Sequence, residues 1–381
     1  MRKPLTNLLI KPAGPDCNIG CRYCFYLSTS RFYPETAVHR MSDDVLAMTV
    51  RQLLAQNEDQ LSFSWQGGEP TLMGLPFYER AVEHEMRYGR GQAVSNALQT
   101  NGIKLDRDWA AFLTKYHFLV GLSLDGPEHV HDQYRVNLGG NGTWQTVDDR
   151  ARMLLDAGVS VNALSVVTEY SATHPQEIYA YLKATGLAYM QFIPCCDRDP
   201  NSPTGFAAHS VSPAAYGQFL CEIFDLWLAD FVDGRPTTSV RFFESLLYLY
   251  ANVAPNDCTL LEECGTYLVV EHTGDVYSCD FYVTPERRLG NVMENGLEQM
   301  LNGEQQKTFG LAKSNLAPAC RSCRWLSYCR GGCPKDRVID ESGTGVSYFC
   351  ESFKTFLSHA DGTFRTLAAR WENGWESPAA D

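Results

Sequence analysis

The chain lacks the features of several large protein classes. Among its 381 residues, no apolar run approaches the ~20 residues that a membrane-spanning helix needs. The apolar stretch behind the charged start Met1–Pro4 ends at Lys11, too early for an export signal. Phosphate-binding Walker loops and Gly-x-Ser-x-Gly elbows are missing as well. The sequence therefore predicts a cytosolic protein with no membrane partner.

Basic residues are also few. The chain has 32 Lys and Arg against 45 Asp and Glu, which gives a net charge of −13. A surface that binds nucleic acid normally carries a basic excess, so nucleic acid is not an expected partner.

Cysteine, in contrast, is abundant, with 14 in the chain. Disulfides are rare in a reducing compartment, so metal ligation is the better interpretation. The cysteines fall into a front group and a back group, and the few between them are assigned no role. The front group is Cys17, Cys21 and Cys24, the back group is Cys258, Cys264, Cys279, Cys320, Cys323, Cys329, Cys333 and Cys350, and the remainder are Cys195, Cys196 and Cys221.

The first half of the chain alternates short β-like runs with amphipathic helical patterns. Such alternation indicates parallel strands joined by crossover helices, hence an α/β fold with an open sheet or partial barrel. Chemistry in these folds lies at the carboxyl ends of the strands. Strands are expected at 8–11, 61–65, 95–100, 119–124, 159–167 and 190–194, and helices at 43–56, 75–88, 106–115, 144–157 and 175–184.

The pattern changes after Pro194. Residues 197–213 are rich in turn formers and indicate a loop, followed by helices at 213–231 and 240–252. Beyond Cys258 the one strong regular element is a hairpin of residues 267–271 and 276–280. The remaining cysteine-dense tail is expected to be loop-like and to need bound metal to fold.

The front cysteines, Cys17-x-x-x-Cys21-x-x-Cys24, directly follow the first expected strand. Three thiolates can hold three irons of a cubane cluster, which normally takes four cysteines. The iron without a protein ligand could then bind a substrate, as a catalytic zinc keeps an open position. A zinc knuckle with a remote fourth ligand fits the same spacing.

This front motif, with Tyr23 as the aromatic residue before the last cysteine, resembles the signature of radical S-adenosylmethionine (SAM) enzymes. The resemblance implies a partial (β/α)6 barrel in which the open iron chelates SAM. One electron from the cluster cleaves SAM to a 5′-deoxyadenosyl radical that abstracts a hydrogen atom.

Other strand ends support the resemblance. The segment Gln66-Gly67-Gly68-Glu69 is similar to the family's Gly-Gly-Glu-Pro stretch, whose backbone contacts the SAM amino group. By the same resemblance, Ser123 and Arg135 would contact the SAM ribose and carboxylate. Taken alone, these residues could equally be a tight turn, a capping serine and a surface arginine.

The eight back cysteines suffice for two fully ligated four-iron clusters or for two structural zinc sites. Their arrangement resembles the SPASM extension of radical SAM enzymes. That resemblance implies a radical SAM core at 1–235, a SPASM domain with a C-terminal helix at 236–370, and a frayed tail at 371–381. It assigns Cys258, Cys264, Cys279 and Cys333 to a first auxiliary cluster and Cys320, Cys323, Cys329 and Cys350 to a second.

From residue 9 to Cys350 the chain is similar to anaerobic sulfatase-maturating enzymes. The resemblance implies oxidation of a Cys or Ser in a sulfatase peptide, Cys/Ser-x-Pro-x-Arg, to Cα-formylglycine. Asp280 would be the base that takes the substrate's proton, and Tyr26 would lie near SAM and substrate. The segments that carry the similarity are 9–12, 24–26, 65–70, 98–102, 120–127, 191–194, 278–282 and 289–291.

The expected partners are an unfolded or nascent sulfatase polypeptide and a flavodoxin- or ferredoxin-type reductant. Two other functions stay open. A maturase that crosslinks a ribosomally made peptide uses the same clusters, although only seven residues precede Leu8, which argues against a fused leader-binding domain. An electron-transfer protein would ligate every cluster fully, and the front motif argues against it. No residue decides between Cys and Ser as the target.

Overall fold

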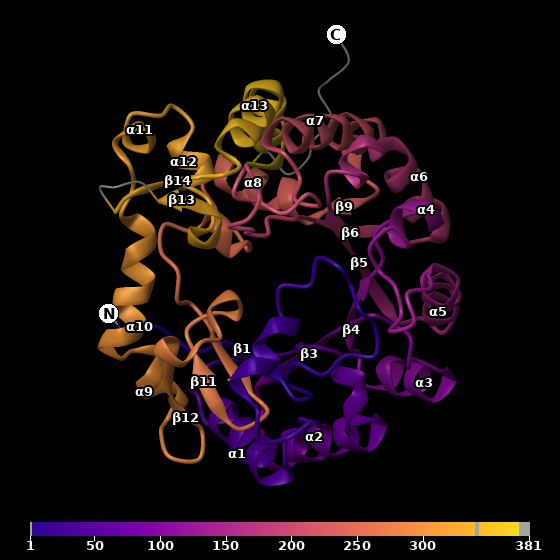
Figure 1. The fold of residues 1–381 in the computed structure, drawn as a ribbon, viewed down its shortest axis with the longest axis vertical. Helices are drawn as coiled ribbons and strands as arrows, with labels where there is room; N and C mark the ends of the chain where they lie inside the picture. The colour runs from indigo at the N-terminus through magenta and orange to yellow at the C-terminus, as the bar shows by residue number, and fades with distance from the viewer. Residues whose placement is uncertain (1, 340–342, 373–381) are drawn as a thin grey trace. The chain divides into compact units, whose positions relative to one another are not determined.

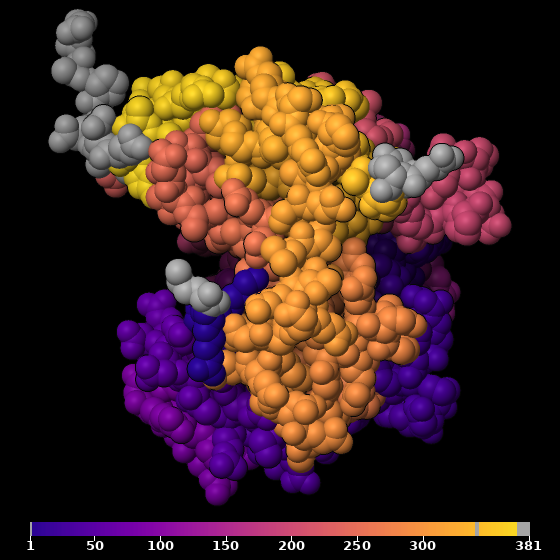
Figure 2. All heavy atoms as spheres, turned by 90° about the vertical axis from the view of Figure 1, so that its left-hand side faces the viewer, coloured from indigo at the N-terminus to yellow at the C-terminus, as the bar shows by residue number. Residues whose placement is uncertain are grey.

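The computed structural model describes residues 2–339 and 343–372, which pack into two units (Figure 1; all atoms in Figure 2). The units are interleaved along the sequence. The first is drawn from Met1–Leu124, Asp132–Val161 and Gly265–Gly310, and the second from Asp125–His131, Asn162–Cys264 and Leu311–Asp381. No helix among the described residues is long and apolar enough to cross a bilayer.

The first unit is built on a sheet with the strand order β12-β11-β10-β1-β2-β3-β4. Strands β1 to β4 run parallel, as the alternating pattern predicts. On the other side of β1, β10 also pairs in parallel, and β11 and β12 continue as an antiparallel meander. The strands are β1 (Asn7–Lys11), β2 (Gln60–Trp65), β3 (Ala93–Thr100), β4 (Leu119–Ser123), β10 (Leu268–Glu271), β11 (Asp275–Tyr277) and β12 (Arg288–Asn291).

Local sequence sets the helix boundaries of this unit. The Ser42 side chain accepts a hydrogen bond from the Val45 amide and so caps α1, and Asp106 caps α3 in the same way. The helices are α1 (Asp43–Leu54), α2 (Leu75–Tyr88), α3 (Arg107–Lys115), α5 (Trp144–Asp156), α9 (Leu297–Leu301) and α10 (Glu304–Leu311).

Helices α9 and α10 correct one expectation. The sequence predicted little regular structure beyond the hairpin, and this prediction is wrong for residues 297–311. Leu, Glu, Gln and Met are strong helix formers, and Leu297, Met300 and Leu301 place three buried side chains on one face of α9.

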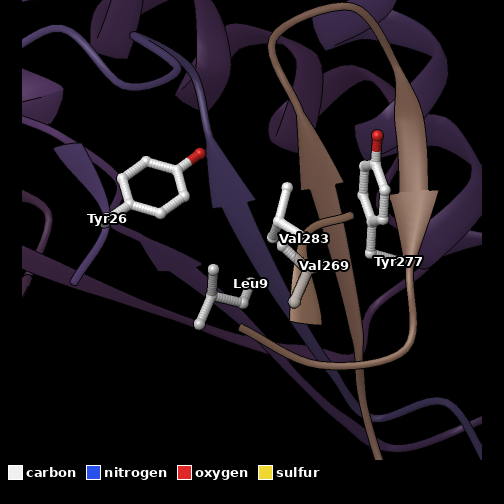
Figure 3. Close-up of a cluster of buried hydrophobic side chains, with 5 residues drawn as sticks. All are labelled: Leu9, Tyr26, Val269, Tyr277 and Val283. Atoms are coloured by element: carbon white, nitrogen blue, oxygen red, sulfur yellow. The ribbon is translucent and has the colours of Figure 1, made fainter. Parts of the chain in front are cut away.

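A small apolar cluster lies against strands β1, β10 and β11 of the first unit's sheet (Figure 3). Leu9 of β1 and Val269 of β10 come from neighbouring strands, and Tyr26, Tyr277 and Val283 complete the cluster. All five side chains are at most 9% exposed, so the loop after Cys24 is fixed to the sheet by buried contacts.

The second unit contains parallel strands β5 (Ser160–Val167), β6 (Tyr189–Pro194) and β9 (Ser239–Val240). Phe224 is at the centre of its aromatic core, with ring centroids 5.2 Å from Phe243, 5.5 Å from Phe356 and 5.0 Å from Phe364. The helices of this unit are α4 (Glu128–His131), α6 (Pro175–Thr185), α7 (Pro213–Ala229), α8 (Arg241–Tyr250), α11 (Pro318–Arg321), α12 (Leu326–Cys329) and α13 (Cys350–Glu372).

The C-terminal helix α13 ends at Glu372. The tail was expected to fray from Trp371, but that residue is still helical, and residues 373–381 lie outside the described part of the chain. The cysteine-dense stretch before α13 has only short elements, including the hairpin β13 (Arg337–Ile339) and β14 (Gly345–Ser347), in agreement with the loop-like expectation.

Candidate active site

The sheet register aligns three polar residues at one edge of the first unit. Lys11 at the end of β1 is the register partner of Glu271 at the end of β10. On the other side of β1, Ile10 pairs with Trp65, and the Gln66 amide donates to the Ile10 carbonyl at 2.9 Å. Parallel strands thus place Lys11, Gln66 and Glu271 at the same carboxyl edge, where α/β folds carry their chemistry.

Asp280, the predicted base, is held at this edge from two sides. It begins a short 3-10 helix (Asp280–Tyr282) just after the hairpin and is 8% exposed. The Lys11 ammonium forms an ion pair with its Oδ1, and Gln66 Nε2 donates to its Oδ2 at 3.0 Å. Both carboxylate oxygens therefore have fixed partners from neighbouring strand ends.

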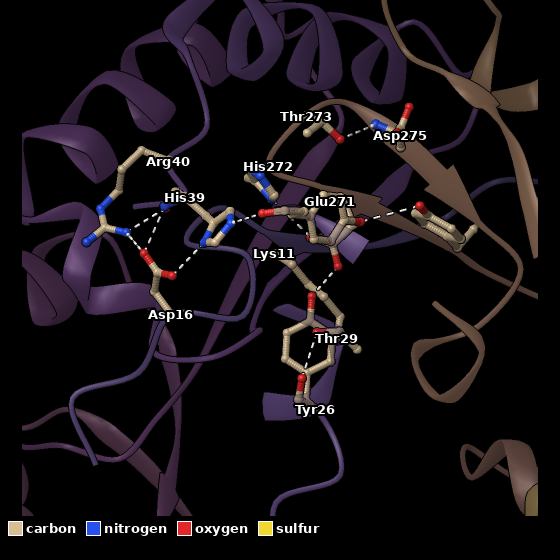
Figure 4. Close-up of polar contacts among 12 residues, drawn as sticks. Lys11, Asp16, Tyr26, Thr29, His39, Arg40, Glu271, His272, Thr273 and Asp275 are labelled. Atoms are coloured by element: carbon tan, nitrogen blue, oxygen red, sulfur yellow. Dashed lines mark hydrogen bonds and ion pairs between the residues drawn. The ribbon is translucent and has the colours of Figure 1, made fainter. Parts of the chain in front are cut away.

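Tyr26, the second predicted catalytic residue, lies against Lys11. The Lys11 ammonium is 3.4 Å from the centroid of the Tyr26 ring, and the Tyr26 hydroxyl donates to Glu271 (Figure 4). His272 Nδ1 is 3.4 Å from the other Glu271 oxygen. Burial raises the pKa of Tyr26, and the Glu271 carboxylate raises it further, so the phenol is held as a donor.

The front cysteines share one loop and act on each other electrostatically. Burial raises the pKa of the Cys17 thiol to about 12, and the nearby Glu69, Cys21 and Cys24 add to this. Arg135 Nη1 is 3.9 Å from Cys21 Sγ, and its guanidinium is 5.4 Å from the centroid of the Tyr23 ring. The predicted SAM contacts Tyr23 and Arg135 are therefore next to the front cysteines.

The Gly-Gly turn after β2 clamps the segment that leads into Cys17. The Gly68 amide donates to the Gly14 carbonyl at 2.8 Å, and the Glu69 amide donates to the Asp16 carbonyl at 2.7 Å. A Cβ on Gly68 would lie 2.0 Å from the Asp16 oxygen, so only glycine fits. Gly67 adopts a φ of +131°, which side chains rarely allow.

Glu69, predicted to contact SAM, has its carboxylate directed into the protein. It accepts hydrogen bonds from the hydroxyl groups of Thr71 and Thr100 and from the amides of Thr71 and Asn101. Burial raises its pKa, and these hydrogen bonds act in the opposite direction. The Glu69 side chain thus links the end of β3 to the turn after β2. Ser123, the other predicted SAM contact, is half-buried at the end of β4.

Four back cysteines line a single pocket in the second unit: Cys320, Cys323, Cys329 and Cys350. The rest of the lining includes the apolar side chains of Trp325, Val346 and Phe353. Burial raises the pKa of the Cys329 thiol, and Cys323, Cys320 and Cys350 contribute to the rise. This set is the one that the family resemblance assigns to the second auxiliary cluster.

The other back cysteines of this unit gather around a buried lysine. Burial lowers the pKa of Lys313, while Cys264, Cys258 and Cys333 act to raise it. Three of the four cysteines assigned to the first auxiliary cluster are thus near one side chain. The fourth, Cys279, belongs to the first unit, where its sulfur lies 3.4 Å from the Tyr267 hydroxyl.

Comparison with known proteins places this geometry in a family. A model of the radical SAM superfamily matches residues 12–182, and a model described as an iron–sulfur cluster-binding domain (SPASM) matches residues 258–324. A serine-type anaerobic sulfatase-maturating enzyme of Bacteroides thetaiotaomicron is 36% identical over 374 residues, covering 94% of this chain and 89% of the relative. The chain belongs to the anaerobic sulfatase-maturating enzymes.

Further sulfatase-maturating enzymes are similar to this chain in sequence and in structure. A cysteine-type enzyme of Clostridium perfringens is 36% identical over 359 residues, covering 94% of this chain and 96% of the relative. The solved structure of native anSMEcpe with bound AdoMet and Cp18Cys peptide has a TM-score of 0.89 and 34% identity, covering 97% of this chain and 100% of that one. Membership confirms the predicted fold class and a radical SAM enzyme with iron–sulfur clusters.

The cysteines of this sulfatase-maturating enzyme suit such clusters. Four thiols around one apolar pocket match a fully ligated four-iron cluster, and three thiols in the front loop match one with an open iron. Within the described residues, no group of three Cys, His, Asp or Glu side chains could hold a single metal ion. A cubane cluster does not need such convergence, because each thiolate binds a different iron.

Sequence reasoning missed Lys11, Glu271 and Lys313. Lys11 ends a buried apolar strand, and a lysine is almost never fully buried without a partner, so its position was a usable signal. Glu271 ends the first strand of the predicted hairpin in the same way. Lys313 gave no signal, because only the folded chain surrounds it with cysteines from distant segments.

Proposed function

We propose that this chain oxidises a Cys or Ser side chain in a sulfatase peptide of the form Cys/Ser-x-Pro-x-Arg to Cα-formylglycine. The observation that carries the proposal is the Asp280 carboxylate, held by Lys11 and Gln66 at a sheet edge. Gln66 continues into the Gly-Gly turn, which is hydrogen-bonded to the segment before Cys17. A candidate base and the front cysteine loop are therefore joined through one short stretch of chain.

In this proposal, the front cysteines Cys17, Cys21 and Cys24 hold the cluster that binds SAM. When bound, SAM and this cluster supply the radical chemistry that removes a hydrogen atom from the substrate. Tyr23, Gln66, Gly67, Gly68, Glu69, Ser123 and Arg135 hold SAM. Glu69 contributes through its backbone, while its side chain fixes the turn that carries the glycines.

The two auxiliary clusters take the ligand sets given by the family resemblance. Cys320, Cys323, Cys329 and Cys350 hold the second cluster, and the single pocket that they line supports this set. Cys258, Cys264, Cys279 and Cys333 hold the first. The radical SAM core extends over 1–235 and the SPASM region over 236–370.

The residues at the carboxyl ends of the strands accept the substrate's proton and orient the group that accepts it. Asp280 accepts the proton that the substrate loses, while Lys11 and Gln66 orient its two oxygens. The electron that leaves the substrate with this proton would pass to an auxiliary cluster. Tyr26 covers Lys11 with its ring and, with the fully buried Glu271, keeps water from the inner side of this edge.

Electrons for the reaction come from a separate carrier of the flavodoxin or ferredoxin type, because SAM cleavage needs a one-electron donor of low potential. The number of free thiols fits a reducing compartment, so the cytosol is the proposed location. The substrate is an unfolded or nascent sulfatase chain, because the target residue must reach an enclosed site.

The test is anaerobic incubation of iron-loaded protein with SAM, a reductant and two short peptides. One peptide carries Cys-x-Pro-x-Arg and the other Ser-x-Pro-x-Arg, and mass spectrometry reads the products. An aldehyde in either peptide identifies the reaction and the target residue. Deoxyadenosine without a peptide product would contradict the sulfatase substrate and favour a maturase of another peptide. Neither product, in protein shown to hold iron, would contradict the enzyme itself.

A further inference from the structure

Lys313 is a fully buried lysine with neutral hydrogen-bond partners. It lies in a short 3-10 helix (Ala312–Ser314), and its exposed fraction is 0%. Its ammonium donates to the backbone carbonyls of Cys258 at 2.9 Å and Thr259 at 2.8 Å. These carbonyls belong to the turn that carries the first cysteine of the back group.

Burial lowers the pKa of Lys313, and the sulfurs of three nearby cysteines act in the opposite direction. These cysteines are Cys264, Cys258 and Cys333, which come from two distant segments of the chain. The segment of Lys313 is held in place by Arg337, which is 5% exposed and donates to the Lys313 carbonyl at 2.7 Å. Both the ammonium and its backbone are therefore fixed beside these thiols.

Such an arrangement is costly without an anion. Burying an ammonium is unfavourable, and two carbonyl dipoles offset only part of that cost. Three neighbouring thiolates that bind a four-iron cluster would supply the missing negative charge. The potential of such a cluster depends on the net charge and hydrogen bonds around it.

We propose that Lys313 is a positioning residue for the first auxiliary cluster, which anchors the Cys258 turn and places a fixed positive charge beside the cluster. The inference rests on the proposed function, because that proposal assigns Cys258, Cys264 and Cys333 as ligands. A cluster gains one negative charge when it takes up one electron, so a nearby cation favours the reduced form. Lys313 thus makes this cluster a better acceptor for the electron that leaves the substrate.

The test is a reduction-potential measurement on the full-length chain. Cys17, Cys21 and Cys24 are replaced by alanine, so that electron paramagnetic resonance during an anaerobic redox titration reports only the two auxiliary clusters. Lys313→Gln keeps a donor and removes the charge, and Lys313→Met removes both. Lys307→Met is the matched control, because Lys307 is an exposed lysine that pairs only weakly, at 3.9 Å from Glu304.

In Lys313→Gln we expect the equilibrium constant for reduction of one cluster to fall about tenfold, which is about 59 mV for a one-electron couple. The other cluster and Lys307→Met keep the parent potentials. Lys313→Met is expected to lose the iron of one cluster, because the Cys258 turn loses its anchor. Loss of that iron in Lys313→Gln as well would support the anchoring role, because the shorter Gln side chain does not reach the Cys258 and Thr259 carbonyls as the ammonium does.

Two results would overturn the inference. One is a fully iron-loaded Lys313→Gln variant with both potentials unchanged. The other is an equal change in both clusters, or loss of both, which would indicate a general role in folding. The measurement needs neither SAM nor peptide, so it is independent of whether the proposed peptide is a substrate. A parent protein without iron at the back cysteines would instead defeat the proposed function.

Discussion

The front cysteine loop and the pocket of the second back set differ in what surrounds the sulfurs. In the pocket, four cysteines are enclosed mainly by apolar side chains such as Trp325 and Phe353, although Ser347 and Lys354 also belong to the lining. In the front loop, three cysteines have polar neighbours: Asn101 Nδ2 is 3.7 Å from Cys17 Sγ, and Arg135 Nη1 is 3.9 Å from Cys21 Sγ.

This difference distinguishes a cluster that only carries electrons from a cluster that can bind a cofactor. A cluster with four protein ligands in an apolar pocket has no position for a substrate and can only carry electrons. A cluster with three ligands keeps one position open, and polar side chains around it can hold a charged cofactor. The number of thiolates and the polarity of the surroundings thus indicate together which site does chemistry.

The largest expected effect comes from removing one front cysteine. Cys24→Ala should lower formation of the peptide product at least about 10³-fold, because the radical chemistry belongs to the bound cofactor. Cys350→Ala should instead lower thermal stability, since the cysteine-dense stretch before α13 has only short elements that bound metal would stabilise. Product formation, iron content and melting temperature check both variants.

The buried Cys221 of α7 provides the control, and Cys221→Ala should keep its iron and most of its activity. If Cys24→Ala were as active as the parent protein, the front cysteines would not hold the cluster that does the chemistry.

The next effect tests the proposed base at the sheet edge. Asp280→Asn should lower the rate of product formation about 10²–10³-fold, the range for loss of a general base. Asp275→Asn is the matched control, because Asp275 lies on the hairpin just before Asp280 and pairs with Arg288 at 2.7 Å. Single-turnover assays with mass spectrometry measure both rates. Parent-like turnover of Asp280→Asn would show that another group takes the proton.

The ion pair between Lys11 and Asp280 extends the comparison. Lys11 is a buried cation in the first unit, and Lys313 is a buried cation among the back cysteines. Lys11→Met should lower the free energy of unfolding by about 3–5 kcal/mol, because it leaves the Asp280 carboxylate buried without its cation. Lys104→Met, at an exposed position, should change it by less than about 0.5 kcal/mol. Denaturant titration compares the two variants, and equal stabilities would argue against the buried pair.

Much of this arrangement could be predicted from the sequence. Alternating patterns predicted β1 to β6 and the parallel pairing, and cysteine spacing with the family resemblance indicated the cluster sets and Asp280. The contacts of these residues could not be predicted, because they depend on register. Lys11 meets Glu271 only because β10 pairs with β1, a pairing between residues about 260 positions apart.

The orientation of Glu69 was also outside the reach of sequence reasoning. The motif indicates that the turn approaches SAM, yet the carboxylate bonds to Thr71, Thr100 and the Asn101 amide inside the protein. A motif thus identifies the backbone that is needed at a site, whereas side-chain direction depends on the neighbouring strand.

The smallest expected effect concerns a buried charge away from the cysteines. Glu85 of α2 accepts one hydrogen bond, from Asn96 Nδ2 at 3.0 Å, and its Oε1 has no partner among the described residues. Burial raises the pKa of Glu85 from 4.5 to about 7. Unlike Lys11, which pairs with Asp280, Glu85 forms no ion pair with any residue in the described part of the chain.

The sign of the pH effect follows from the pKa of Glu85, which is higher in the folded than in the unfolded state. Above pH 7 the carboxylate is ionised in both states, and its burial costs the folded state up to about 3 kcal/mol. As the pH falls from 7 to 4.5, the folded state binds a proton before the unfolded state does, so this cost disappears. Glu85→Gln should therefore be more stable than the parent protein at pH 8 and equally stable near pH 4.5. Urea titrations at both pH values check this, and a pH-independent difference would show that Glu85 is not the titrating group.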